Sequence, residues 1–125
     1  MKPTLAMISA RDIKDMTAFY RDVMQFAVVR ELDDWVELDA GDFQIALHAI
    51  PAAIAAKLVI ATPPVPRSET PIKLLFESTD LGALRARLRA SGLELPARRR
   101  EGGGAPDHVD GFDVEGNVFA ARERS

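Results

Sequence analysis

Residues 12–26 read DIKDMTAFYRDVMQF and determine the local fold of the first half of the chain. Asp12 has the side chain of a helix N-cap, and Asp15 stands three residues later, as in a variant of the capping box. The apolar residues that follow recur at helical spacing, at positions 16, 19, 20, 23 and 24. This single stripe predicts a helix that begins after Asp12 and packs one face on a core.

Strands are predicted on both sides of this helix, because apolar and polar residues alternate there. They are expected over residues 4–10 before the helix and over residues 26–32, 34–39 and 43–50 after it. Successive side chains of a strand point to opposite faces of its sheet. Trp35 and Glu37 therefore share one face of their strand, and Gln44 shares a face of the next strand with His48.

The second half of the chain repeats this order of elements. Residues 62–66 read TPPVP and exclude both a helix and a central strand, so about residues 51–70 are expected to form a linker. Asp80 then precedes a helical stripe of leucines, as Asp12 precedes the first helix. Further strands are expected over residues 72–78, 93–99, 109–114 and 118–122. The sequence therefore predicts one domain with an α+β fold of two βαβββ modules, over about residues 1–50 and 71–125.

The composition is that of a single globular domain. The chain has 125 residues, of which 47% are hydrophobic and 28% are charged. The absence of cysteine excludes disulfides, zinc–thiolate sites and thiol nucleophiles. The net charge of −3 gives no overall attraction to nucleic acid or to an anionic membrane, so we expect neither as a partner. No signal-peptide pattern and no apolar stretch of membrane-spanning length is found, so a cytoplasmic location is expected.

Three motifs carry a family resemblance. The aspartate-led helix of residues 12–26 contains a Phe-Tyr pair and ends in MQF, where LGF is usual. Residues 35–38 (WVEL) and 46–48 (ALH) are similar to a third and a fourth strand of that family. Residues 111–118 (GFDVEGNV) are similar to its closing hairpin, with Val-Glu in place of Pro-Asp. With these motifs in this order, the chain resembles the vicinal oxygen chelate superfamily of glyoxalases, bleomycin resistance proteins and extradiol dioxygenases.

The resemblance implies two modules whose curled mixed sheets form a cup for a ligand, with the helices on the outer face. It also implies a homodimer in which modules of two chains complete each cavity. In enzymes of the family, His, Gln or Glu side chains hold a divalent metal ion that polarises the substrate or activates water. The resemblance places these ligands at Leu5, near Ile45, at Leu74 or Leu75, and at Ala120.

Aliphatic side chains cannot ligate a divalent cation, so we expect no metal site and no cofactor. If the alignment with the family is shifted by one residue, Gln44 replaces Ile45 among the implied ligand positions. The other positions stay aliphatic, so the metal site is still not formed. The alternative is a divalent metal ion at a relocated site, built from His48, His108, Glu37 and Glu77.

The ligand-binding candidates are polar or aromatic residues on the strands of the expected cup, because a small-molecule site is an apolar cavity with a few polar groups. They are Trp35, Glu37, Gln44, His48, Phe76, Phe112 and Phe119. The catalytic candidates are His48, as a general base or hydrogen-bond donor, and Glu77, as a carboxylate in an otherwise apolar strand. Each residue also fits a structural role, because aromatic rings fill interiors and strand-end polar groups form hydrogen bonds or ion pairs.

The sequence therefore predicts a protein that binds a small apolar or aromatic molecule and lacks the family's metal site. The alternative is a lyase, isomerase or dioxygenase of the same superfamily with a non-standard site, so whether the chain is an enzyme stays open.

Residues 98–100 are three arginines beside a glycine loop, but the Lys-Ser/Thr of a phosphate-binding P-loop does not follow. A solvated edge is expected there.

Overall fold

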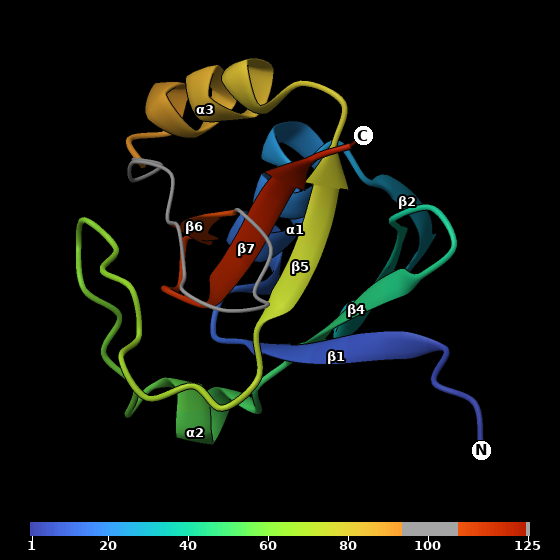
Figure 1. Cartoon of the computed structure of the whole chain (residues 1–125). Coiled ribbons are helices and arrows are strands. Elements are labelled where there is room, and N and C mark those ends of the chain that lie inside the picture. The colour runs from blue at the N-terminus through green and yellow to red at the C-terminus, as the bar shows by residue number, and fades with distance from the viewer. Residues whose placement is uncertain (94–107, 125) are drawn as a thin grey trace. The chain divides into compact units, whose positions relative to one another are not determined.

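The computed structural model describes residues 1–93 and 108–124, and the chain divides into two compact units, Met1–Ile60 and Ala61–Ser125 (Figure 1). Each unit is built around its own mixed β-sheet. The α+β class with two sheets is confirmed. No helix among these residues has the length and hydropathy of a membrane span.

The first unit contains a four-stranded sheet in the order β1-β4-β3-β2. Its strands are β1 (Leu5–Ala10), β2 (Ala27–Glu31), β3 (Trp35–Asp39) and β4 (Gln44–Ala49). β1 runs parallel to β4, and the other neighbouring strands are antiparallel. The helix α1 (Ile13–Ala18) follows β1, and the short helix α2 (Ala52–Ala55) follows β4.

The second unit contains a sheet in the order β5-β7-β6 among the residues that the structure describes. Its strands are β5 (Leu74–Ser78), β6 (Val109–Phe112) and β7 (Val118–Glu123). β5 runs parallel to β7, as β1 does to β4, and the helix α3 (Leu81–Ala90) lies between β5 and β6 in sequence. The strand expected over residues 93–99 lies, except for Leu93, outside the described residues, and so do the arginines at 98–100.

Each of the two longer helices packs on one face of its own sheet. α1 packs on β3 and β4, where Leu38 and Ile45 are fully buried, and its Met16 is also fully buried. α3 packs on β7 and buries Leu88, and Ala121 of β7 is fully buried. Removal of this apolar surface from water is the main stabilising contribution in each unit.

Both helices begin at the aspartates that the sequence predicts. Asp12 Oδ1 accepts a hydrogen bond from the backbone N–H of Asp15 at 3.0 Å, and Asp80 Oδ1 accepts one from the N–H of Ala83 at 2.9 Å. Each carboxylate satisfies a backbone donor that has no partner inside the helix.

The first helix ends in a π-helical turn, η1 (Phe19–Val23), whereas the sequence predicts one continuous α-helix. The apolar stripe is nevertheless buried, including Phe19 and Tyr20. Gln25 follows this turn and has a φ of 61°. This is the left-handed region, in which a side chain other than that of glycine is strained. It is also the position at which the resembled family has glycine.

Gln25→Gly is therefore expected to raise the free energy of unfolding by about 0.5–1 kcal/mol, because glycine adopts this backbone conformation without steric strain. Gln25 is exposed, so the substitution removes little packing. Urea denaturation followed by circular dichroism measures the change. Gln25→Ala is the matched control, since alanine shortens the side chain and keeps the strain. An equal gain in the alanine variant would contradict this explanation.

Candidate ligand-binding site

The face of the first sheet opposite α1 carries most of the polar candidates. Trp35 pairs with His48, Glu37 pairs with Ala46, and Gln44 pairs with Leu5. Paired residues of neighbouring strands place their side chains on the same face. This surface, here named the first helix-free face, consists of Leu5, Met7, Ser9, Ala27, Arg30, Trp35, Glu37, Asp39, Gln44, Ala46 and His48. Four of the sequence-predicted residues are thus brought together.

The side chains on this face contact one another. The indole Nε1 of Trp35 donates a hydrogen bond to Glu37 Oε1 at 3.0 Å. The rings of Trp35 and His48 meet edge to face, with their centroids 5.6 Å apart. Arg30 Nη1 lies 4.0 Å from the same oxygen of Glu37. The Glu37 carboxylate is therefore held in place beside an aromatic pair.

A hollow of about 670 Å³ lies at the end of this face and includes His48 in its wall. Its other polar lining residues are Arg11, Asp12 and Asp34. The rest of the lining consists of apolar residues between positions 49 and 56. Arg11 Nε donates to the carbonyl oxygens of Ala55 at 3.2 Å and Leu58 at 2.9 Å. These bonds fix the segment around α2 at the rim. The volume is in the range of small-molecule sites.

The second sheet also has a face opposite its helix. Ala120 lies at its centre and pairs with Leu75 on one side and with Asp110 on the other. The second helix-free face consists of Lys73, Leu75, Glu77, His108, Asp110, Phe112, Val118, Ala120 and Arg122. Among the described residues, two ion pairs lie on it: Arg122 Nη2 is 3.3 Å from Glu77 Oε2, and Lys73 Nζ is 3.2 Å from Asp110 Oδ1. His108 Nε2 lies 3.6 Å from the same oxygen of Asp110.

The structure separates the three phenylalanines that the sequence groups as ligand contacts. Phe112 lies on the second helix-free face, paired with Val118. Phe76 and Phe119 lie on the opposite face, where their rings meet edge to face with centroids 5.7 Å apart. Phe119 is only 2% exposed. α3 packs on β7, the strand that carries Phe119. Phe76 and Phe119 therefore do not share a face with Phe112.

The positions implied for metal ligands do not fit a divalent cation. Among the alternative positions, Gln44 rather than Ile45 pairs with Leu5, and Leu75 rather than Leu74 pairs with Ala120. The set therefore offers one amide and three aliphatic side chains, and hydrocarbon groups provide no electron pair for a metal. Within residues 1–93 and 108–124, no three His, Asp or Glu residues form a group that could hold a metal ion.

The two catalytic candidates have different surroundings. His48 is exposed at the end of β4 and contacts Trp35. Glu77 lies in the ion pair with Arg122, and its side chain is 42% exposed. They belong to different units of the chain.

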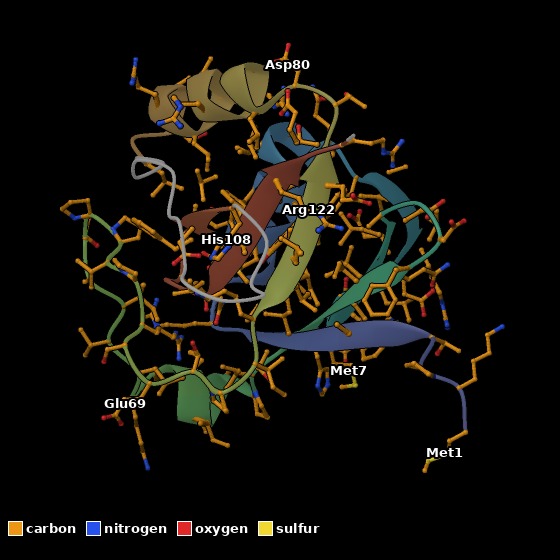
Figure 2. The ribbon with its side chains drawn as sticks, in the orientation of Figure 1. Met1, Met7, Glu69, Asp80, His108 and Arg122 are labelled. Carbon is orange, nitrogen blue, oxygen red and sulfur yellow. The ribbon has the colours of Figure 1, made fainter. Side chains whose placement is uncertain are left out.

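The sequence-predicted site residues do not include the charged partners on the second helix-free face, which are Arg122, Lys73 and Asp110. Figure 2 labels Arg122 and His108 on the second sheet. The alternation Val118, Ala120, Arg122 contains the signal, because it places Arg122 on the same face as the position implied for a metal ligand.

Comparison with known proteins gives a family match. A family model described as the Glyoxalase/Bleomycin resistance protein/Dioxygenase superfamily matches residues 3–120. No curated protein matches the chain.

Solved structures share the fold over nearly the whole chain. Lactoylglutathione lyase from Agrobacterium tumefaciens is 22% identical, with a TM-score of 0.66, and the match covers 98% of this chain and 92% of that one. The bleomycin resistance determinant encoded on transposon Tn5 is 16% identical, with a TM-score of 0.65 and coverage of 100% and 99%. The antibiotic binding protein TnmS3 from Streptomyces is 19% identical, with a TM-score of 0.67 and coverage of 100% and 97%.

Proposed function

The chain belongs to the Glyoxalase/Bleomycin resistance protein/Dioxygenase superfamily, and from this premise we propose that it binds a small apolar or aromatic molecule on the first helix-free face without a metal ion. The observation that carries the proposal is the register of the first sheet, which groups Trp35, Glu37, Gln44 and His48 on one face. Such a face combines aromatic surface for the body of a ligand with a few polar groups that fix its orientation.

Each residue has a distinct part in the proposed complex. The apolar body of the ligand stacks on Trp35 and extends toward Met7, which is 59% exposed. Glu37 accepts a hydrogen bond from the ligand, because the Trp35 indole already holds its carboxylate in place. His48 and Gln44 each offer a donor and an acceptor. The hollow beside His48 accommodates the rest of the molecule.

The donor chemistry supports binding without a metal. Leu5, Leu75 and Ala120 stand where metal ligands are implied, and Gln44 alone cannot form a site. Relatives of the same fold include a bleomycin resistance determinant and an antibiotic binding protein, which are precedents for binding, as well as a lyase. We further propose a homodimer, as the resemblance implies, and a cytoplasmic location.

The neutral dye N-phenyl-1-naphthylamine tests the proposal, because its emission rises in an apolar site. Saturable binding is expected, with energy transfer from Trp35, the single tryptophan of the chain. His48→Ala is expected to weaken dye binding about tenfold, since the variant removes one wall of the aromatic site. Ile72→Ala is the matched control, because Ile72 is exposed and lies outside this face, and its affinity should equal that of the unsubstituted protein.

Two further measurements decide between binding and catalysis. Calorimetry of tag-free protein with Ni²⁺, Zn²⁺, Mn²⁺ and Fe²⁺ is expected to show no tight stoichiometric binding. Uptake of one ion per chain would overturn the metal-free proposal. Turnover of lactoylglutathione that His48→Ala abolishes would overturn it in favour of an enzyme. Dye affinity that is identical in the His48→Ala and Ile72→Ala variants would place the ligand elsewhere.

A further inference from the structure

Residues 51–59, here named the α2 segment, form one wall of the hollow at the end of the first sheet (Figure 1). The segment contributes Pro51 and the alanines at positions 52, 55 and 56 to the lining. The rest of the lining comes from the turn after β1, the turn before β3 and the end of β4 with the residue that follows it. The position of the α2 segment therefore helps to set the size of the hollow.

Packing does little to hold this segment in place. None of the residues of α2 is buried, and Ile54, Leu58 and Val59 are 55%, 37% and 93% exposed. The backbone hydrogen bonds of the helix are local, as from the N–H of Ala55 to Pro51 O at 2.9 Å and from the N–H of Leu58 to Ala55 O at 3.1 Å. A helix of one turn is not stable by itself. The position of α2 therefore depends on its attachment to the rest of the first unit.

The two ends of the α2 segment are attached to the first unit in different ways. The N-terminal end continues from β4, where the N–H of Ile50 donates a hydrogen bond to Ala10 O at 2.9 Å. Towards the other end, Arg11 Nε donates to the carbonyl oxygens of Ala55 at 3.2 Å and Leu58 at 2.9 Å. A cation is favourable beside carbonyl groups at the C-terminal end of a helix. The guanidinium of Arg11 therefore holds the part of the segment that lies beyond the sheet.

We propose that the α2 segment is a movable wall of the hollow and that Arg11 is the positioning residue that holds this wall in place for the ligand. The inference rests on the proposed function and deepens it, because it names the residue that prepares the hollow for binding. Arg11 acts through the wall rather than through its own contact with the ligand. Without Arg11 the wall is mobile in the ligand-free protein, and a ligand that contacts it must order it at an entropic cost.

A purely structural role for Arg11 makes a different prediction. An arginine that only stabilises the first unit would affect the free energy of unfolding, and a bound ligand would leave the motion of the α2 segment unchanged. A positioning role couples the wall to the ligand, so that the ligand protects the wall and the ordered wall raises the affinity for the ligand. This coupling is reciprocal and is measurable from either side.

Hydrogen–deuterium exchange of the backbone amides of residues 55–58 measures the motion of the wall. Arg11→Gln is expected to speed this exchange at least about tenfold in the ligand-free protein, because a charged donor to two carbonyl groups is lost. Saturation with N-phenyl-1-naphthylamine should slow the exchange in this variant at least about threefold, and the variant should bind the dye about fivefold more weakly. Arg21→Gln is the matched control, because Arg21 is an exposed arginine of the same unit that pairs with Asp22. It should leave exchange at residues 55–58 and dye affinity within about twofold.

Exchange at residues 55–58 that Arg11→Gln leaves unchanged would overturn the proposal. Exchange that is accelerated equally in the amides of β4 would also overturn it, because the effect would then be a general loss of stability. Dye that binds but gives residues 55–58 no protection refutes this inference alone. Faster local exchange in a protein that binds no dye refutes the proposed function alone and still supports Arg11 as the residue that holds the wall.

Discussion

Asp113→Ala is expected to lower the free energy of unfolding by about 3 kcal/mol or more. Asp113 lies in the turn between β6 and β7 and is fully buried. Its Oδ1 accepts hydrogen bonds from the backbone N–H groups of Glu115 at 2.9 Å and Asn117 at 3.0 Å, and its Oδ2 accepts one from Asn117 Nδ2 at 2.9 Å. Alanine removes these acceptors, so donors in the interior of the turn lose their partners.

Urea denaturation followed by circular dichroism measures this loss. Tryptophan fluorescence is less suitable, because the single tryptophan, Trp35, lies in the first unit. Asp110→Ala is the matched control, since it removes an aspartate of the same hairpin from a partly exposed ion pair with Lys73. Asp110→Ala should lower the free energy of unfolding by less than about 1 kcal/mol. Equal losses in the two variants would show that the hydrogen bonds of Asp113 do not stabilise the turn.

Gly116→Ala is expected to destabilise the protein by about 3 kcal/mol, through two effects of similar size. Gly116 has a φ of 85°, at which any side chain is strained. A Cβ atom at this position would also overlap the carbonyl oxygen of Val65. That oxygen cannot easily move away, because the neighbouring Arg67 donates its backbone N–H to Gly116 O at 2.9 Å and its Nε to Glu115 O at 3.2 Å.

Gly92→Ala separates the two effects. Gly92 has a similar φ of 78°, and nothing lies within 4 Å of a Cβ built there. Gly92→Ala should therefore lower the free energy of unfolding by only about 1.5 kcal/mol, the cost of the backbone conformation. The difference between the two variants, measured in the same urea experiments, is the cost of the overlap with Val65. A loss in Gly116→Ala no larger than that in Gly92→Ala would rule out this overlap as a constraint.

Both predictions explain the motif of residues 111–118 in physical terms. Asp113 and Asn117 are hydrogen-bonded to each other within the turn. Gly116 has no side chain, which leaves room for the carbonyl oxygen of Val65. The turn sets the register between β6 and β7. That register places Ala120 beside Asp110, on the face that also carries Arg122.

The first sheet and its site were predictable because their patterns are unambiguous. Leu38 and Ile45 belong to apolar positions that alternate with polar or aromatic ones, so only one face of each strand suits a core. Alternation places Trp35 with Glu37 on one strand and Gln44 with His48 on the next, and the register of the sheet brings the two pairs to one face. The helix caps Asp12 and Asp80 were predictable for a similar reason, since a cap depends on residues three positions apart.

The second sheet was less predictable because the aromatic candidates were grouped without regard to their faces. Leu75 is an apolar residue between Lys73 and Glu77, so the polar face of this strand also carries apolar surface. The docking of α3 on β7 decides that Phe76 faces the helix and Leu75 does not. The charged partners of Arg122 and Lys73 come from other strands, so a reading of each strand alone did not group them.

The amino-acid sequence by itself determined where the helices begin and which side chains of a strand share a face. These properties depend on neighbours within a few residues along the chain. Only the tertiary structure decided which face of each sheet the helix covers, that Gln44 rather than Ile45 lies beside Leu5, and that Asp113 is buried. Those properties depend on how distant segments pair and pack, and local preferences alone do not specify that pairing.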